Sequence, residues 1–272
     1  MSLNAKVLVD NNGMEATPGE WGLSIYIVYN GKKILLDAGA SDLFLANADA
    51  FGIDISQVEY AVLSHAHYDH SLGMKGFFNS NEKAKFYVRG ENIENCYAKK
   101  FFLKKYIGVP RKITAEFPDR FEHVKGDYKL CDGVTLVPHK IAGLSEQGKR
   151  ECMYVKEGHR FVPDCFAHEQ SLVFNTDKGL VIFNSCSHGG AANIIKEGAM
   201  TFPDKHVYGI VGGFHLFNKS EGEIRELAHQ IKNTKIEYVC TGHCTKNRAY
   251  KILQEELGDK LHQLSVGMEM EF

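Results

Sequence analysis

The chain has 272 residues, 44% of them hydrophobic and 24% charged, with a formal net charge of −2 at pH 7. This composition is ordinary for a globular enzyme, and the weak net charge offers no long-range attraction to nucleic acid or to an anionic membrane. No apolar stretch approaches the roughly 20 residues needed to cross a bilayer, and the N-terminus lacks a signal-peptide core. The seven scattered cysteines favour free thiols over a disulfide framework. We therefore expect a cytoplasmic protein with neither a nucleic-acid nor a membrane partner.

Strands separated by turns are expected over the first part of the chain. The runs 6–10 and 23–29 are rich in β-branched and aromatic residues, and Asn30-Gly31 is a hairpin turn into a third strand over 33–37. Apolar periodicity and end signals then predict the following elements. They are a helix over 41–51, a buried strand over 58–63, helices over 72–79 and 91–106, and extended chain over 122–139 with a turn at Asp132-Gly133.

Residues 143–167 have few periodic apolar positions. A loop this long inside a compact domain is usually functional or mobile, so we expect a rim or lid over a site. Strands and helices alternate after it: strands over 170–175, 179–184, 207–212 and 237–241, and helices over 191–199, 220–233 and 246–257. Because no Pro/Gly linker divides the chain, we expect one α/β (α+β) domain over residues 1–272. Its two sheets would lie face to face with helices on both outer faces, a four-layer αββα sandwich.

Four metal-capable side chains follow the buried strand 58–63 directly. They are His65, His67, Asp69 and His70, all within six residues. In a helix these side chains would point in different directions around the axis, whereas a tight loop at a strand end can turn all four toward one point. Imidazole nitrogen with carboxylate oxygen suits zinc, iron or manganese, and the absence of a nearby Cys pair argues against a closed structural zinc site. The alternative, an exposed His-rich turn without metal, is disfavoured by this density of ligands.

Three more histidines follow expected strand ends: His188, His215 and His243. His188 precedes Gly189-Gly190, where small residues allow the backbone to approach an ion closely. For a single histidine a structural role is the default. Matching positions at the ends of neighbouring strands nevertheless make His188 and His243 candidates for the same site.

The spacing His-x-His-x-Asp-His resembles the signature of the metallo-β-lactamase superfamily, where it also follows a buried strand. Further segments resemble the branch labelled as similar to 7,8-dihydropterin-6-methyl-4-(β-D-ribofuranosyl)aminobenzene-5′-phosphate synthase. These segments are residues 22–24, 168–172, 184–190, 212–216 and 242–245, whereas residues 34–39 and 238–243 resemble the superfamily as a whole. The resemblance runs from about residue 7 to the C-terminus. The resemblance strongly implies the fold but only weakly implies the substrate, because one fold hosts many functions.

The resemblance implies a site for two divalent metal ions, zinc in the first place, with manganese or iron as alternatives. Residues His65 and His67 would hold one ion, and Asp69 and His70 the other. His188 would complete the first set and His243 the second, with His168 left open as an alternative to His188.

Two other positions are expected to support these ligands. Cys186 falls where the superfamily usually has a bridging Asp. It is either a thiolate ligand or a small buried side chain, and we favour the second because cysteine so often packs in cores. Asp37 is expected to orient a ligand imidazole or the metal loop, although an ordinary role in a strand-end turn has comparable weight.

The function implied is hydrolysis of a small phosphorylated or pterin-like metabolite by a metal-bridging hydroxide. Asp69 would also steer the proton of the nucleophile, and His215 would protonate the leaving group or bind a substrate phosphate. The helix start after Gly189-Gly190 and a lysine of the basic segment 99–106 could add contacts to an anion. Two alternatives stay open: a synthase or transferase that forms a ribofuranosyl-aminobenzene-phosphate product, and a metal redox protein.

The ligand set predicts two metal ions per chain, because six candidate ligands are too many for one zinc site of three or four protein ligands. Elemental analysis of protein purified without chelator should give about two equivalents of zinc, manganese or iron. A content below about a tenth of an equivalent after reconstitution with these metals would contradict this expectation.

Overall fold

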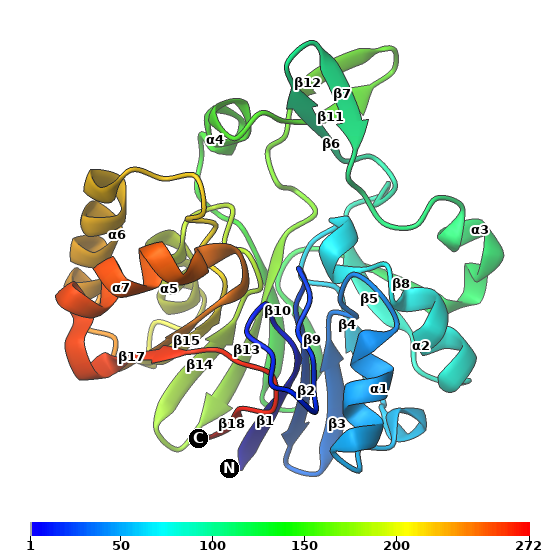
Figure 1. Ribbon diagram of the computed structural model, residues 1–272, viewed down its shortest axis with the longest axis horizontal. Coiled ribbons are helices and arrows are strands. Elements are labelled where there is room, and N and C mark those ends of the chain that lie inside the picture. The colour runs from blue at the N-terminus through cyan, green and yellow to red at the C-terminus, as the bar shows by residue number, and fades with distance from the viewer. Residues whose placement is uncertain (1) are drawn as a thin grey trace.

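Two seven-stranded sheets pack face to face in the computed structural model, which describes residues 2–272 (Figure 1). The first sheet has the order β18-β1-β2-β3-β4-β5-β8 and the second the order β17-β16-β15-β14-β13-β10-β9. Strands of the first sheet are β1 (Leu3–Val9), β2 (Ser24–Tyr29), β3 (Lys32–Leu36), β4 (Tyr60–Val62), β5 (Phe86–Arg89), β8 (Phe121–Val124) and β18 (Glu269–Glu271). Strands of the second are β9 (Tyr128–Cys131), β10 (Val134–Pro138), β13 (Gln170–Thr176), β14 (Gly179–Phe183), β15 (Val207–Gly212), β16 (Tyr238–Thr241) and β17 (Leu261–Gln263).

Helices cover the outer face of each sheet. The α-helices are α1 (Leu43–Ala50), α2 (Met74–Ser80), α3 (Ile113–Glu116), α4 (Leu144–Arg150), α5 (Ala191–Thr201), α6 (Glu221–Asn233) and α7 (Lys246–Leu257). The 3-10 helices are η1 (Ile55–Gln57), η2 (Tyr68–His70), η3 (Pro118–Arg120), η4 (His243–Thr245) and η5 (Gly258–Lys260). Helices α1 and α2 lie outside the first sheet, and α5, α6 and α7 lie outside the second (Figure 1).

Three apolar clusters correspond to the three interfaces between these four layers. The central one joins the facing sides of both sheets, with Ile25 and Leu36 from the first and Phe174 and Phe183 from the second. A second cluster lies between the first sheet and α1 and α2. A third lies between the second sheet and α5, α6 and α7. The expected four-layer αββα architecture is confirmed.

Local sequence signals set several of the turns and ends. Asn30 and Gly31 both have positive φ, 47° and 82°, as a two-residue hairpin turn between β2 and β3 requires. Helix α6 begins with a capping box, in which the Ser220 hydroxyl accepts from the Glu223 amide and the Glu223 carboxylate accepts from the Ser220 amide. These elements lie where the sequence predicts them.

A third sheet, absent from the sequence expectations, projects from the sandwich at the top of Figure 1. It has the order β12-β11-β6-β7 and consists of β6 (Tyr97–Lys100), β7 (Leu103–Tyr106), β11 (Met153–Glu157) and β12 (Arg160–Pro163). The predicted helix over 91–106 is therefore wrong, because its second half is a β-hairpin. The predicted loop over 143–167 is also wrong as a structureless segment, since it contains α4 and the hairpin β11–β12.

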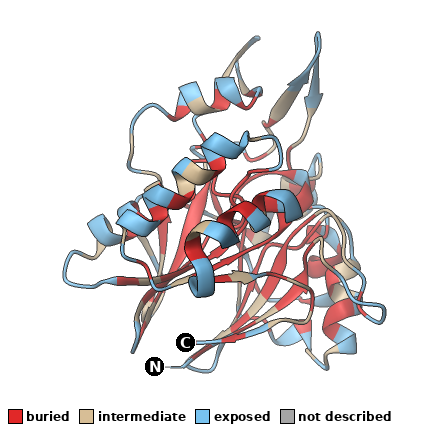
Figure 2. Cartoon of the chain, turned by 60° about the vertical axis from the view of Figure 1, so that its left-hand side comes forward, coloured by how far each residue is buried: buried red, intermediate tan, exposed pale blue. Residues whose placement is uncertain are grey.

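Long-range pairing accounts for the failed helix prediction. Tyr97 pairs with Tyr106 across the hairpin and with Tyr154 across β11, and Lys104 lies over the ring of Phe161. Cross-strand aromatic pairs of this kind stabilise a sheet and override weak helix propensity. The lysines of segment 99–106 are exposed on this hairpin (Figure 2).

The strand ends of both sheets lead into the loops that carry the candidate ligands. The loop after β4 contains His65, His67, Asp69 and His70, while the loops after β14 and β16 contain His188 and His243. Within residues 2–272, no helix is long and apolar enough to span a membrane.

The third sheet should exchange its amide hydrogens faster than the central strands. Its buried apolar support is a small cluster of Leu144, Met153 and Phe166, whereas β14 is buried at four of five positions. Hydrogen exchange followed by mass spectrometry should therefore show weaker protection in β6, β7, β11 and β12 than in β13–β15. Equal protection in the two sets would show that the third sheet opens only with the whole fold.

Candidate metal centre

The metal loop is organised by Asp37, a fully buried carboxylate directly after β3. Its Oδ1 accepts from the Ser64 amide at 2.7 Å, and its Oδ2 accepts from the Ser64 hydroxyl at 2.7 Å and from His70 Nδ1 at 2.8 Å. The Ser64 hydroxyl also lies 2.8 Å from His65 Nδ1. A hydroxyl that donates to Asp37 can accept from His65 Nδ1–H, so Asp37 directs the Nε2 atoms of both His65 and His70 away from itself.

Three imidazoles form the first group of candidate ligands: His65, His67 and His188. Ligand atoms of the three lie within 4.8 Å of one another. The ring centroids of His65 and His67 are 4.6 Å apart, and the His188 centroid lies 4.9 Å and 4.8 Å from them. Nε2 of all three rings is buried and has no hydrogen-bond partner among the described residues. Converging nitrogens with free lone pairs are what a metal site of the histidine type requires.

His188 is held by two contacts on its far side. The Phe166 ring stacks on the imidazole at a centroid distance of 4.8 Å and an interplanar angle of 9°. The Glu169 carboxylate accepts from the amides of His188 at 3.0 Å and Gly189 at 3.1 Å. The amides of His188 and Gly189 are thus occupied by a carboxylate of the protein itself and are not available to a substrate.

Asp69, His70 and His243 form the second group. Asp69 Oδ2 lies 3.7 Å from His70 Nε2 and 3.4 Å from His243 Nε2. Burial alone would raise the pKa of Asp69, but the His70 and His243 imidazoles outweigh it and hold that pKa below its usual value. A carboxylate that stays ionised between two imidazoles is suited to binding a cation.

His243 is positioned by the end of β1, a contribution that the sequence did not indicate. Asp10 Oδ2 accepts from the His243 amide at 2.8 Å, and Asn11 Oδ1 lies 3.2 Å from His243 Nδ1. Donation from Nδ1–H to Asn11 leaves Nε2 of His243 facing Asp69. Burial raises the pKa of Asp10 to about 6. The available signal was that Asp10, like Asp37, is an acid directly after a buried strand.

Cys186 is buried, as expected, but it is more than a packing residue. Its Sγ lies 3.3 Å from His70 Nε2 and 3.4 Å from Cys244 Sγ. Cys186 also forms compact groups with His65 and His70 and with His188 and His215. The sulfur therefore lies between the two ligand groups, and the thiolate-ligand alternative is geometrically open.

His215 lies beside the first group rather than in it. Its ring centroid is 4.3 Å from that of His188, and its Nε2 is 3.5 Å from Glu151 Oε2. Glu151 also pairs with Lys219 Nζ. Burial alone would lower the pKa of His215, but the Cys244 thiol and the Glu151 carboxylate outweigh it and raise that pKa to about 9. An imidazolium here can donate a proton or bind an anion.

His168 has a structural role that explains why it is the weaker ligand candidate. Its Nδ1 accepts from the Ala66 amide at 3.1 Å, and its Nε2 lies 3.0 Å from Asp164 Oδ2. Because the acceptor nitrogen is occupied by Ala66 and the donor nitrogen by Asp164, no lone pair is left for a metal. His168 instead fixes the backbone between His65 and His67, whereas both ring nitrogens of His188 lack a partner.

The donor set fits divalent metal ions. Burial lowers the pKa of His65 and His188 well below the ordinary value and that of His67 to about 3, so these imidazoles are neutral. Neutral imidazole is the form that binds a metal. Burying several unpartnered ring nitrogens is unfavourable unless something else satisfies them.

Two cavities approach these groups. One of about 430 Å³ is lined by His188 and His215 together with Arg150 and Lys219. Another of about 230 Å³ lies beside His243 and Lys246. The lysines of segment 99–106 line neither cavity, so the structure does not place them where the sequence expectation needed them.

Comparisons with known proteins agree with the fold. A family model for the metallo-β-lactamase superfamily matches residues 19–147. The chain is 26% identical to the 7,8-dihydropterin-6-methyl-4-(β-D-ribofuranosyl)-aminobenzene-5′-phosphate synthase of Methanocaldococcus jannaschii, an alignment that covers 92% of this chain and 90% of that protein. It is 27% identical to an uncharacterised protein of the same organism, over 92% and 93% of the two chains. Among solved structures, Tm1679, described as a metal-dependent hydrolase of the β-lactamase superfamily, superposes with a TM-score of 0.82 at 27% identity, covering 99% of both chains.

Replacing Asp37 with Asn should weaken metal binding without unfolding the chain. Asn tolerates the positive φ of 59° at this position, but an amide cannot accept from Ser64 and His70 as a carboxylate does. We expect the metal dissociation constant of Asp37→Asn to rise by about 10–100-fold, the usual effect of losing a group that orients a ligand. Competition with a chelating dye measures it, and Asp259→Asn, an exposed acid in η5, is the control. Unchanged affinity in Asp37→Asn would show that the loop orients its ligands without this carboxylate.

Proposed function

We propose that this chain, which matches the model of the metallo-β-lactamase superfamily over residues 19–147, is a metal-dependent hydrolase of small phosphate-bearing metabolites. The observation that carries this proposal is the convergence of unpartnered imidazole nitrogens and an ionised Asp69 beside a cavity lined by cationic side chains. Metal-ion, nucleophile and substrate binding would then share one region of the molecule.

The residues that would hold the metal ions are in two groups. His65, His67 and His188 form one, Asp69, His70 and His243 the other, and Cys186 lies between them. Two divalent ions, zinc in the first place, would supply a water of lowered pKa and positive charge to stabilise the transition state. Asp37 and Asn11 keep the ring nitrogens of His70 and His243 directed at the site.

The substrate class follows from the cavity beside His188. Its volume of about 430 Å³ suits a small metabolite, and Arg150, Lys219 and His215 supply positive charge. Glu151 neutralises part of this charge through Lys219 and His215, but within residues 2–272 the side-chain partner of Arg150 is the neutral Gln147. A guanidinium in this state favours a phosphate or carboxylate group.

We assign protonation of the leaving group to His215. Glu151 Oε2 lies 3.5 Å from its Nε2, and the Cys244 sulfur accepts from its backbone amide at 3.2 Å. These contacts hold the ring against His188, at the boundary between the metal ligands and the cavity. A proton donor at this boundary can assist the departure of an alkoxide.

A second candidate function is a group-transfer reaction. It is favoured by the relative named as a synthase, whose product contains a pterin, an aminobenzene and a phosphorylated ribose. The same metal ligands could serve either reaction, since both need an electrophile held beside a positive site. The two differ in whether an oxygen atom of water enters the product.

Labelled water distinguishes these two functions. Metal-loaded protein is incubated in ¹⁸O-water with phosphorylated pterins, ribosyl phosphates and nucleotides, and the products are analysed by mass spectrometry. Hydrolysis places one ¹⁸O atom in a product, whereas transfer between two substrates places none. Turnover of uncharged lactones or thioesters, with no turnover of any phosphorylated compound, would contradict the phosphate-bearing substrate.

Replacing His215 with Asn should slow hydrolysis in a way that depends on the leaving group. An alkyl phosphate ester needs protonation as it departs, so its kcat should fall by about 10²–10⁴-fold. A p-nitrophenyl ester departs without a proton and should lose much less. An equal loss for both esters, expressed mainly in KM, would instead assign His215 to binding the substrate anion. The control is Lys251→Gln, an exposed position on α7.

A further inference from the structure

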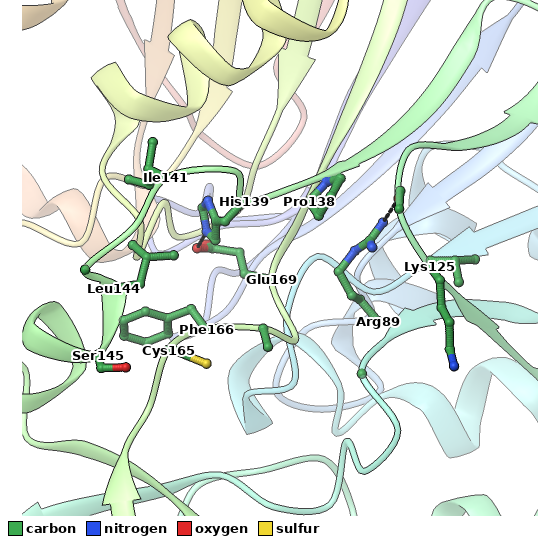
Figure 3. Close-up of a pocket in the computed structure, with 15 residues that line it drawn as sticks. Arg89, Lys125, Pro138, His139, Ile141, Leu144, Ser145, Cys165, Phe166 and Glu169 are labelled. Atoms are coloured by element: carbon green, nitrogen blue, oxygen red, sulfur yellow. Dashed lines mark hydrogen bonds and ion pairs between the residues drawn. The ribbon is translucent and has the colours of Figure 1, made fainter.

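A cavity of about 500 Å³ is lined by residues that also support His188 (Figure 3). Phe166 and Glu169, which contact His188 on its far side, are among the residues that line it. The cavity is separate from the one beside the metal ligands. The first residues of α4, Leu144 and Ser145, line it, whereas Gln147 and Arg150 of the same helix line the other.

Arg89, the last residue of β5, is the unusual feature of this cavity. Its side chain lines the cavity although the residue is only 6% exposed, and Nη2 donates to the Gly126 carbonyl at 2.9 Å. Its buried Nε has no hydrogen-bond partner, and no carboxylate forms an ion pair with it within residues 2–272. Buried arginines are almost always paired with an acid, because an uncompensated charge is costly to remove from water.

The acid that acts on this guanidinium and the acid that lines the cavity with it are both committed elsewhere. Asp127 acts on Arg89 electrostatically, but its Oδ2 pairs with Lys140 Nζ at 2.7 Å. Glu169 accepts from His139 and from the amides of His188 and Gly189. The part of the chain that the structure describes therefore offers no ion-pair partner to Arg89, and an anion inside the cavity would supply one.

The remaining walls show what else such an anion must carry. Ile141, Leu144 and Phe166 form an apolar side opposite Arg89 and Lys125 (Figure 3). Lys125 is at the rim, with its side chain 81% exposed, and pairs only loosely with Glu91 at 3.5 Å. The cavity thus has one cationic side and one apolar side, and a volume in the usual range for a small ligand.

We propose that this cavity binds a small organic anion, with its carboxylate or phosphate on Arg89 and an apolar body against Ile141, Leu144 and Phe166. The bound molecule would contact the Phe166 ring that stacks on His188, so the cavity is a second ligand site behind the metal centre. This inference does not rest on the proposed hydrolase activity, because none of the residues that carry it faces the substrate cavity.

Cys165 provides a local probe, because its exposed thiol lines this cavity. Cys152 is also exposed but does not line the cavity, and it serves as the internal control. Metal-loaded full-length protein is alkylated with iodoacetamide, and labelling of each cysteine is followed by peptide mass spectrometry. The compounds tested are phenyl phosphate, benzoate, inorganic phosphate and the uncharged benzamide.

Phenyl phosphate or benzoate should slow labelling of Cys165 about tenfold at ten times its dissociation constant, by mass action, and leave Cys152 unchanged. The compound that protects Cys165 more strongly shows whether the cavity prefers a phosphate or a carboxylate. Inorganic phosphate should protect less because it lacks the apolar body. Arg89→Gln should abolish the protection. Arg150→Gln alters only the substrate cavity and should retain the protection of Cys165. Retained protection would exclude binding in the substrate cavity beside the metal centre as the cause.

Three results would overturn the proposal: no saturable protection by either organic anion, equal protection by benzamide, or full protection in Arg89→Gln. If Arg89→Gln does not fold, the comparison of benzoate with benzamide on the unmodified chain decides whether the cavity recognises charge. Loss of protection in Arg150→Gln, with Arg89→Gln unaffected, would place the anion in the substrate cavity instead.

Discussion

The Asp37 carboxylate determines which nitrogen two histidines of the metal loop, His65 and His70, present. One fully buried carboxylate receives the Ser64 amide, the Ser64 hydroxyl and His70 Nδ1, and through that hydroxyl it also sets the tautomer of His65. A neutral residue at this position could not accept all three donors, and the rings would then be free to rotate or change tautomer. Because the ligand groups share this support, displacement of one carboxylate would disturb both groups together.

How much the sequence could predict depended on how far apart the interacting residues lie. The metal loop was recognisable because its four ligands are within six residues, and His188 and His243 because each follows a buried strand. The choice between His188 and His168 needed the neighbours of each ring, Ala66 and Asp164 for His168, which no local pattern reveals. The third sheet was missed for the same reason: Tyr97 and Ala98 of β6 pair with Tyr154 and Met153 of β11, so the conformation of β6 is decided by a partner far along the chain.

Two buried carboxylates, Asp37 and Glu169, position candidate metal ligands. Asp37 orients rings from the first sheet, whereas Glu169 binds the amides of His188 and Gly189 from the second. Glu169 is itself held by His139, whose other nitrogen contacts Glu197 at 3.0 Å. Although burial disfavours the charged imidazole, the two glutamates raise the pKa of His139 to about 10. These two carboxylates act on ligands of their own sheets, whereas His243 of the second sheet is positioned by Asp10 and Asn11 of the first. Packing the sheets together therefore completes the centre.

The order of synthesis has a consequence for the edge of the first sheet. Of the strands in this sheet, β1 is synthesised first and its outer neighbour β18, residues 269–271, is synthesised last, and the two lie side by side (Figure 1). Until those last residues leave the ribosome, the outer hydrogen-bonding groups of β1 have no strand beside them. An uncovered strand of this kind is open to pairing with other chains. The nascent protein therefore exposes this strand edge until β18 has been synthesised, and the three residues of β18 then cover it.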